Sequence, residues 1–234
     1  MTITVITGAN KGLGYQSARR LIEKGHHVIV GSRDVERGRA AASGLGGGAR
    51  FVQLDVTSDN SVNAAIADIA RHEGRIDVLI NNAGIAGTYA PAEELTAADA
   101  THLLETNLVS IVRMTHAALP LLATSSNPVI VNVSSGMGSF ARKVDGSLIG
   151  GSGLVMPLYS ASKAAVTMLT TQYAAALPAI RINAADPGYT NTDFNGHSGT
   201  QTTQEGTDAI VELATIGTDG PTGQFYDRAG VVPW

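Results

Sequence analysis

The feature that most constrains the fold is an alternation of short apolar runs with longer helix-like segments. The runs are rich in β-branched residues and mostly apolar at consecutive positions, which is typical of strands covered on both faces. They are Ile3–Thr7, His27–Val30, Arg50–Leu54, Ile76–Asn81, Pro128–Val133 and Ile180–Ala185. Segments near residues 12–24, 34–43, 58–72, 96–123 and 160–177 carry helix formers with apolar residues three and four apart. The sequence therefore predicts an α/β fold, a doubly wound, Rossmann-like parallel sheet in a single domain spanning residues 1–234.

Composition narrows the class of function. A net charge of −4 gives no reason to expect nucleic acid or an anionic membrane as a partner. The chain has no cysteine, which excludes disulfides, thiol catalysis and cysteine-ligated zinc, and its six histidines form no H-E-x-x-H pair, so we expect no metal. We find neither a signal-peptide pattern nor an apolar run of the ~18–20 residues that span a bilayer. We expect a cytoplasmic enzyme.

A glycine-rich turn joins the first predicted strand to the first predicted helix. Its glycines allow a tight turn and bring backbone amides and a helix N-terminus close to negative charge. The sequence therefore predicts dinucleotide binding at Gly8, Asn10, Lys11, Gly12, Leu13 and Gly14. A second glycine-rich string, Gly44–Ala49, follows a helix and precedes a strand, so we interpret Gly44–Gly48 as a flexible loop.

Two charged residues follow the second predicted strand and bear on the choice of cofactor. A basic residue there can neutralise the 2′-phosphate of NADP, whereas an acidic one can hold the ribose diol of NAD. Arg33 occupies the first of these positions, with Lys11 as a second phosphate contact, and Asp34 follows as an alternative ribose ligand. The pattern favours NADP(H) over NAD(H).

Further polar residues follow the third, fourth and fifth strands. Asp55-Val56-Thr57-Ser58 and Asn81-Asn82-Ala83-Gly84 lie where the carboxyl ends of parallel strands bind ligands, although Thr57 or Ser58 could also cap the next helix. Asn107 falls inside a predicted helix, where asparagine is unfavourable. It is either exposed or buried in a polar role.

Tyr159 and Lys163 are four residues apart in a predicted helix, which places the phenol and the ammonium on one face. A tyrosine ionises near pH ~10, and a neighbouring positive charge favours its anion. We therefore expect Lys163 to lower the pKa of Tyr159 and make it a general acid or base. Ser134 and Ser135 follow the fifth strand, and no G-x-S-x-G elbow of a hydrolase is present.

Taken together, these motifs resemble the classical branch of the short-chain dehydrogenase/reductase family, most closely its NADPH-dependent carbonyl reductases. The resemblance runs from Thr2 to about Thr192. It is carried, in order, by Thr7–Gly14, Asp55-Val56, Asn81–Gly84, Asn107, Ser135, Tyr159–Lys163 and Pro187-Gly188.

The resemblance implies a catalytic set of four residues. Tyr159 would exchange a proton with the carbonyl or alcohol oxygen, and Lys163 would lower its pKa and bind the nicotinamide ribose. Ser135 would orient the substrate oxygen, with Ser134 as its rival, and Asn107 would hold a water linked to Lys163.

The resemblance also implies cofactor and substrate contacts. Asp55 and Val56 would lie along the adenine. The further cofactor contacts would be Asn82, Ala83, Gly84, Pro187, Gly188, Thr190 and Thr192. The family usually has Val or Ile at Thr190, and we expect its backbone contact with the carboxamide to survive. A pocket for a neutral, fairly apolar ketone or aldehyde would take Met137, Phe140, Leu154, Met156, Tyr189, Phe194 and Trp234.

Two segments distinguish this chain. A glycine-rich insert at about 141–157 lengthens the gap between Ser135 and Tyr159. In the carbonyl reductases that the chain resembles, a longer insert near here obstructs the usual helix-bundle interface, so the resemblance implies a monomer or homodimer rather than a tetramer. The polar stretch at about 193–206 is expected to form a mobile lid over the substrate. A non-catalytic NADP-binding regulator, or epimerase or dehydratase chemistry on the same fold, are the alternatives to an NADPH-dependent carbonyl/alcohol oxidoreductase.

Overall fold

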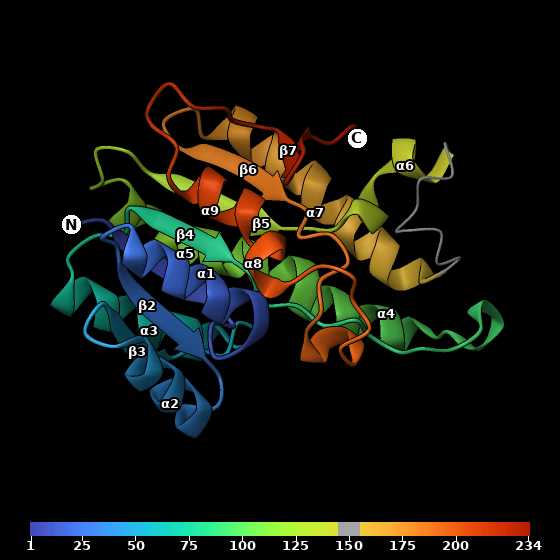
Figure 1. The fold of residues 1–234 in the computed structure, drawn as a ribbon, viewed down its shortest axis with the longest axis horizontal. Helices are drawn as coiled ribbons and strands as arrows, with labels where there is room; N and C mark the ends of the chain where they lie inside the picture. The colour runs from blue at the N-terminus through green and yellow to red at the C-terminus, as the bar shows by residue number, and fades with distance from the viewer. Residues whose placement is uncertain (145–154) are drawn as a thin grey trace.

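The structure, a computed structural model, describes residues 1–144 and 155–234 and contains an eight-stranded sheet (Figure 1). The strands follow the order β3-β2-β1-β4-β5-β6-β7-β8; each neighbouring pair from β3 to β7 is parallel, and β8 is antiparallel to β7. They are β1 (Ile3–Thr7), β2 (His27–Ser32), β3 (Ala49–Gln53), β4 (Val78–Asn81), β5 (Val129–Val133), β6 (Arg181–Ala185), β7 (Phe225–Asp227) and β8 (Gly230–Val231). The strand order reverses between β1 and β4, where open α/β sheets bind ligands. The predicted doubly wound sheet is confirmed.

Helices cover both faces of the sheet (Figure 1). One core lies under α1, α2 and α9, and the other lies under α3, α5 and α7. The helices are α1 (Gly12–Glu23), α2 (Val35–Leu45), α3 (Asp59–His72), α4 (Ala97–Leu104), α5 (Ser110–Leu122), α6 (Phe140–Val144), α7 (Pro157–Ala176), α8 (Thr203–Gly206) and α9 (Asp208–Ala214). Short 3-10 turns are η1 (Ala92–Glu94), η3 (Gly136–Gly138) and η5 (Asp193–Asn195).

The two cores explain why the strands are apolar at consecutive positions. Side chains alternate across a strand, so neighbours point to opposite faces. Val5 packs under α3 and α5, while Ile6 packs under α1 and α9. In β4, Leu79 belongs to the core under α3 and α5, and Ile80 belongs to the core under α1 and α9.

The predicted helical segment 96–123 is interrupted at its centre. It consists of α4, a π-helical stretch η2 (Glu105–Val109) and α5. Thr96 caps α4 in a reciprocal pair with Asp99, as its sequence position favours. The widened turn of a π-helix is frequent at functional sites, and here it contains Asn107.

The C-terminal elements β7, β8, α8 and α9 were not predicted. Each is short, and a three-residue strand such as β7 has too few positions to show a period. Tertiary burial forms these elements instead, since Phe225 of β7 is 1% exposed. Residues 145–154 of the predicted insert lie outside the described residues.

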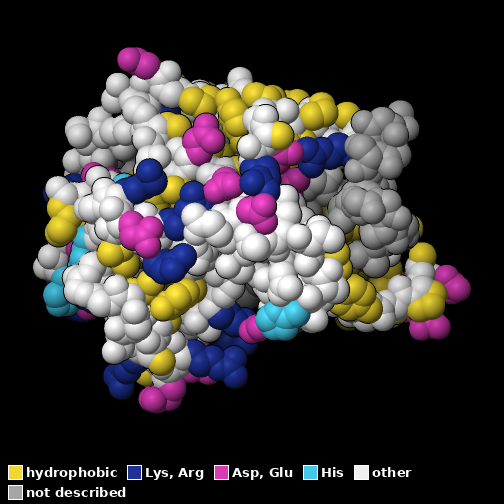
Figure 2. Space-filling model, in the orientation of Figure 1, with side chains coloured by type: hydrophobic (Ala, Val, Ile, Leu, Met, Phe, Trp, Pro, Cys, Tyr) yellow, Lys and Arg dark blue, Asp and Glu magenta, His cyan; other side chains and the backbone are white. Residues whose placement is uncertain are grey.

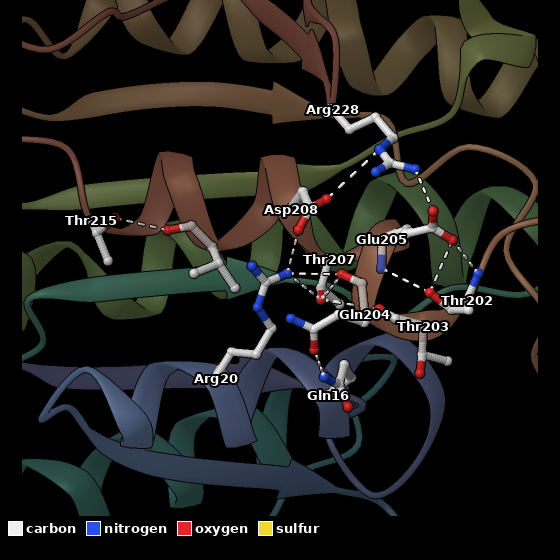
Figure 3. Close-up of polar contacts among 11 residues, drawn as sticks. Gln16, Arg20, Thr202, Thr203, Gln204, Glu205, Thr207, Asp208, Thr215 and Arg228 are labelled. Atoms are coloured by element: carbon white, nitrogen blue, oxygen red, sulfur yellow. Dashed lines mark hydrogen bonds and ion pairs between the residues drawn. The ribbon is translucent and has the colours of Figure 1, made fainter.

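A polar network, here called the latch, ties α8 and α9 to α1 (Figure 3). Arg20 of α1 donates to the carbonyl of Gln204, to Thr207 Oγ1 at 2.9 Å and to Asp208 Oδ1 at 2.8 Å. On the other side, Arg228 pairs with Glu205 at 2.7 Å. Figure 2 shows acidic and basic side chains interspersed over this face.

Within the described residues, no helix combines the length and the apolar character needed to cross a membrane.

Candidate active site

A cavity of about 1280 Å³ opens at the carboxyl ends of the strands. It exceeds the ~300–1,000 Å³ typical of a site for one small ligand, so a dinucleotide and a substrate could share it. Most of the predicted site residues line it: Gly8, Asn10, Lys11, Gly12, Leu13, Gly14, Arg33, Asp55, Val56, Asn82, Ala83, Gly84, Ser135, Met137, Met156, Tyr159, Lys163, Pro187, Gly188, Tyr189, Thr190, Thr192 and Phe194. The structure therefore brings the two halves of the predicted site together.

The glycine-rich turn forms a cradle that side chains would fill. Gly8 and Gly12 have φ of +65° and +54°, the left-handed region that favours glycine. A Cβ on Gly14 would lie 2.6 Å from the carbonyl oxygen of Gly8. Asn82 holds the turn from β4, since its Nδ2 donates to the carbonyls of Thr7 and Gly8 at 2.9 and 3.2 Å. This bare, fixed backbone at the start of α1 fits the phosphates of a dinucleotide.

The two charged residues after β2 have different surroundings. Arg33 is exposed and lines the cavity. Asp34 instead caps α2, where its carboxylate accepts from the backbone N–H of Arg37 at 3.0 Å and pairs with the Arg37 side chain. Lys11, which the sequence predicts as the second contact to the 2′-phosphate, forms an ion pair with Asp193 of η5 at 3.0 Å.

After β3, Asp55 is bound to its own loop. Burial raises the pKa of its carboxyl group, but two hydrogen bonds from Thr57 to Oδ1, at 2.7 and 3.0 Å, together with the charges of Arg33 and Arg113, hold the pKa below its ordinary value. Of the two cap candidates, Ser58 caps α3 by accepting from the N–H of Ser61.

Tyr159 and Lys163 lie one turn apart on α7, with Nζ of Lys163 5.7 Å from the centre of the Tyr159 ring. Nζ donates to the carbonyl oxygen of Val133 at 2.8 Å. Burial raises the pKa of the Tyr159 hydroxyl, opposed by a hydrogen bond with Ser135, and burial lowers the pKa of Lys163 to about 8. The expectation that Lys163 lowers the pKa of Tyr159 is therefore wrong for the protein by itself, because desolvation is the larger effect.

The two serines after β5 are distinguished by their partners. Ser134 is 2% exposed, and its hydroxyl donates to the carbonyl of Lys163 at 3.0 Å. Ser135 instead faces Tyr159, with which it forms the hydrogen bond described above, and its Oγ accepts from the N–H of Met137 at 3.2 Å.

Asn107 is 1% exposed, so the exposed alternative was wrong. Its Oδ1 accepts from the N–H of Ile85 at 2.9 Å, and its Nδ2 donates to the Ile85 carbonyl and to Ser162 Oγ. A Cβ on Gly84 would lie 3.4 Å from Asn107 Oδ1 and 3.7 Å from Lys163 Nζ. Asn107 therefore joins the loop after β4 to α7 directly behind the cavity.

Sequence reasoning missed a buried carboxylate, that of Asp186, whose charge acts on Tyr159 and Lys163. Asp186, at the end of β6, is 4% exposed; its Oδ1 accepts from the N–H of Gly188 at 2.9 Å. Its Oδ2 accepts from Arg142 of α6 at 2.7 Å, and Arg142 also bonds Asp227 of β7. The only sequence signal was an acidic residue directly before Pro187-Gly188.

Some of the residues predicted for the substrate pocket line the cavity, and others lie elsewhere. Met156 and Phe194 line it, and the Phe194 ring is 5.9 Å from that of Tyr159. Phe140 and Trp234 do not: Phe140 is 72% exposed, and Trp234 stacks on Phe225 with ring centres 6.0 Å apart. Those two predictions were wrong, because the Phe140 side chain on α6 is exposed to solvent and Trp234 packs on Phe225 of β7 instead. Leu154 lies outside the described residues.

Several further residues line the cavity without having been predicted. They come from separate elements, so no local pattern joins them: Tyr89, His102, Arg142, Asp186, Gln201 and Asp227. Among the described residues, no group of three or more His, Asp or Glu side chains is placed to hold a metal.

Comparison with known proteins agrees with this geometry. The (+)-neomenthol dehydrogenase of Capsicum annuum is 30% identical over 300 aligned positions, which cover 97% of this chain and 96% of that protein. Salutaridine reductase from Papaver somniferum has a TM-score of 0.86 at 27% identity over 97% of this chain and 100% of that one. The NADPH-bound carbonyl reductase from chicken fatty liver has a TM-score of 0.86 at 25% identity over 100% of both chains. The model of the short chain dehydrogenase family matches residues 2–203, so the chain belongs to that family of oxidoreductases.

Proposed function

We propose that this protein is an NADPH-dependent oxidoreductase that interconverts a ketone or aldehyde and the corresponding alcohol. The observation that carries the proposal is the meeting of Tyr159, Ser135 and Lys163 at one part of a cavity that also contains the glycine cradle and Arg33. Such a site can hold a dinucleotide and still present a proton donor to a second molecule. The reductases among its relatives support the same activity.

In this mechanism the chain supplies placement and proton transfer. Bound NADP(H) would supply or accept the hydride. Ser135 and Tyr159 hydrogen-bond the substrate oxygen, which orients and polarises the carbonyl. In reduction, the phenol of Tyr159 gives its proton to that oxygen; in oxidation it takes the proton back. Lys163, whose Nζ donates to the Val133 carbonyl, would hold the nicotinamide ribose.

The preference for NADP(H) over NAD(H) rests on charge at the end of β2. Arg33 is exposed at the cavity and can meet a 2′-phosphate. Asp34 is engaged as the cap of α2 rather than turned to a ribose diol. The carbonyl reductase from chicken fatty liver is an NADPH complex, and a gluconate 5-dehydrogenase from Burkholderia cenocepacia, with a TM-score of 0.82 at 26% identity, is a complex with NADP.

Several coarser expectations belong to the same proposal. The substrate is a neutral, fairly apolar small molecule, since Met137, Met156 and Phe194 line the cavity and the Phe194 ring packs near that of Tyr159. The stretch 193–206 acts as the lid, and its residues Asp193–Gly196 line the cavity. We propose a cytoplasmic monomer or homodimer.

The test is oxidation of NADPH by the purified protein in the presence of a panel of ketones and aldehydes. Tyr159→Phe should lower turnover at least about 100-fold because it removes the proton donor, while NADPH affinity stays near that of the wild type. Full activity in this variant would remove Tyr159 from the mechanism. Tight NADPH binding without turnover on any carbonyl would favour the regulator, and conversion of a substrate without net change in cofactor would favour an epimerase or dehydratase.

Arg33→Ala tests the cofactor preference separately. Loss of one charge-assisted contact to a phosphate should weaken NADPH binding about tenfold or more and leave NADH binding nearly unchanged. Titration of both cofactors by fluorescence measures this. Equal weakening of the two would refute the assignment of Arg33 to the 2′-phosphate.

A further inference from the structure

The turn that follows Ser135 is packed against a buried ion pair. Arg142 Nη1 donates to Asp186 Oδ2 at 2.7 Å, and the Asp186 side chain is only 4% exposed. Gly136 comes directly after Ser135, and a Cβ on it would lie 2.6 Å from Arg142 Nη1 and 2.7 Å from Asp186 Oδ2. The ion pair therefore lies directly on the backbone of the turn that carries Ser135.

The same carboxylate also holds a second wall of the cavity. Asp186 Oδ1 accepts from the N–H of Gly188 at 2.9 Å, in the loop after β6. The backbone N–H of Asp186 donates to the carbonyl of Tyr226 at 2.7 Å, and Arg142 also donates to Asp227 of β7. The ion pair thus joins the turn after β5, the loop after β6 and the end of β7.

Arg142 reaches this pair from a helix that is itself held in place. The hydroxyl of Ser139 accepts from the N–H of Arg142 at 3.2 Å and donates to the carbonyl of Pro233 at 2.6 Å. The N–H of Ala141 donates to the carbonyl of Trp234 at 2.9 Å. Because α6 is bonded to residues 233–234, the guanidinium is presented from a fixed backbone.

The chemistry of the pair suits a fixed contact rather than a loose one. A guanidinium is planar and can bond two carboxylates at once, as Arg142 does with Asp186 and Asp227. Removing one partner of a buried ion pair leaves an uncompensated charge, so the two groups hold one another strongly. The charge of Asp186 acts on both Tyr159 and Lys163, so the pair is close to the reacting groups.

We propose that Arg142 is a positioning residue: its ion pair with Asp186, seated on Gly136, holds Ser135 where its hydroxyl meets Tyr159. The hydroxyl of Ser135 is hydrogen-bonded to Tyr159, and a displacement of about 1 Å in such a group can cost about 100-fold in rate. This inference rests on the proposed function of Ser135 and Tyr159. It gives α6 a part in orienting the substrate oxygen, which sequence reasoning did not assign to it.

The test asks whether the loss of Arg142 acts through Ser135. Arg142→Met removes the ion pair and keeps an unbranched side chain. We expect kcat for carbonyl reduction to fall about tenfold and KM for NADPH to stay within about twofold, because Ser135 orients the substrate rather than the cofactor. In the Ser135→Ala background the hydroxyl is already absent, so the same substitution should change kcat by less than about twofold. Arg142→Lys restores a cation beside Asp186 and should recover most of the wild-type kcat.

Arg228→Met is the matched control. Arg228 also lines the cavity, but it pairs with Glu205 and Asp208 instead of lying on the turn of Ser135. Whatever this change does to the rate, it should do so by the same factor with and without the Ser135 hydroxyl.

Equal factors for Arg142→Met in the two backgrounds, or an unchanged kcat in the first, would overturn the role of Arg142. If Arg142→Met does not fold, the double variant Arg142→Met/Asp186→Asn takes its place, because it leaves no buried charge without a partner. Its kcat is then compared at each variant's optimum pH, with the same expected result. A wild type that reduces no carbonyl with NADPH would instead contradict the proposed function.

Discussion

At the scale of single residues, desolvation and one buried carboxylate act on Tyr159 and Lys163 in different ways. Burial raises the pKa of Tyr159 and lowers that of Lys163, so it favours the neutral form of each. Asp186 raises the pKa of both groups, because a negative charge opposes the phenolate and favours the ammonium. Tyr89 adds a smaller effect of the same sign on Tyr159. The acidity of Tyr159 and Lys163 thus depends on their burial and on the charge of Asp186.

Asp186→Asn should move the pH–rate profile to lower pH. The amide keeps an acceptor for the N–H of Gly188 and removes the charge, so the pKa values of Tyr159 and Lys163 both fall. We expect the rising limb of alcohol oxidation to shift down by at least about half a pH unit. The measurement is kcat/KM against pH.

Asp227→Asn is the control for this prediction. Asp227 shares Arg142 with Asp186, but among the described groups it does not act on the pKa of Tyr159 or Lys163. Its substitution should leave the profile in place whatever it does to the rate. A profile of Asp186→Asn that coincided with the wild type would exclude a charge effect of Asp186.

At the scale of elements, the position of α7 depends on close backbone contact with η3. A Cβ on Gly138 would lie 2.6 Å from the backbone carbon of Lys163 and 2.7 Å from the nitrogen of Ala164. The Ser134 hydroxyl also donates to the Lys163 carbonyl. The turn after β5 is therefore pressed against the part of α7 that carries Tyr159 and Lys163, and only glycine allows this distance.

Gly138→Ala should destabilise the protein and reduce turnover together. The added methyl group meets backbone atoms that cannot rotate away, so we expect a loss of about 1–3 kcal/mol in the free energy of unfolding. Displacement of α7 should also lower kcat. Urea denaturation and steady-state kinetics measure the two effects.

Gly217→Ala provides the matched control. A Cβ at Gly217 meets no atom within 4 Å, so this change should stay within about 0.5 kcal/mol of the wild type. Equal stability of the Gly138 and Gly217 variants would mean that α7 does not need the close contact.

At the scale of the whole molecule, the latch joins α1 to the last helices of the chain. Arg20 and Asp208 are 188 residues apart in sequence, and their side chains meet at 2.8 Å. Arg228 continues the network to the β7–β8 turn through Glu205. An isolated exposed ion pair contributes little to stability, but Arg20 is only 17% exposed and makes several hydrogen bonds. The network therefore holds α8, at the end of the lid segment, and α9 against α1, the helix that follows the glycine-rich turn.

Arg20→Met should weaken the attachment of α8 and α9 to α1, because it removes the hydrogen bonds of Arg20 to Gln204, Thr207 and Asp208. We expect the free energy of unfolding to fall by about 1–2 kcal/mol and NADPH affinity to fall with it, since α8 loses its hold on α1. Arg19→Met removes an exposed arginine from the same helix and should change neither quantity. Denaturant titration and cofactor titration of both variants decide the matter, and identical behaviour of the two would contradict a supporting role for the latch.

The sequence by itself determined the parts of this protein that depend on spacing along the chain. Runs of apolar β-branched residues specify buried parallel strands, and a glycine-rich turn between β1 and α1 specifies a phosphate cradle. The spacing of Tyr159 and Lys163 places both on one side of a helix. These features are local, so their residues are informative before the chain is folded.

The tertiary structure alone decided which side chains are desolvated and which distant residues meet. The burial of Asn107, the raised pKa of Tyr159, the effect of the Asp186 carboxylate on Tyr159 and the pairing of that carboxylate with Arg142 all depend on neighbours from other elements. Short elements such as β7 and α8 likewise form because the fold buries them. Solvation and long-range contact are properties of the packed chain, and no pattern of nearby residues encodes them.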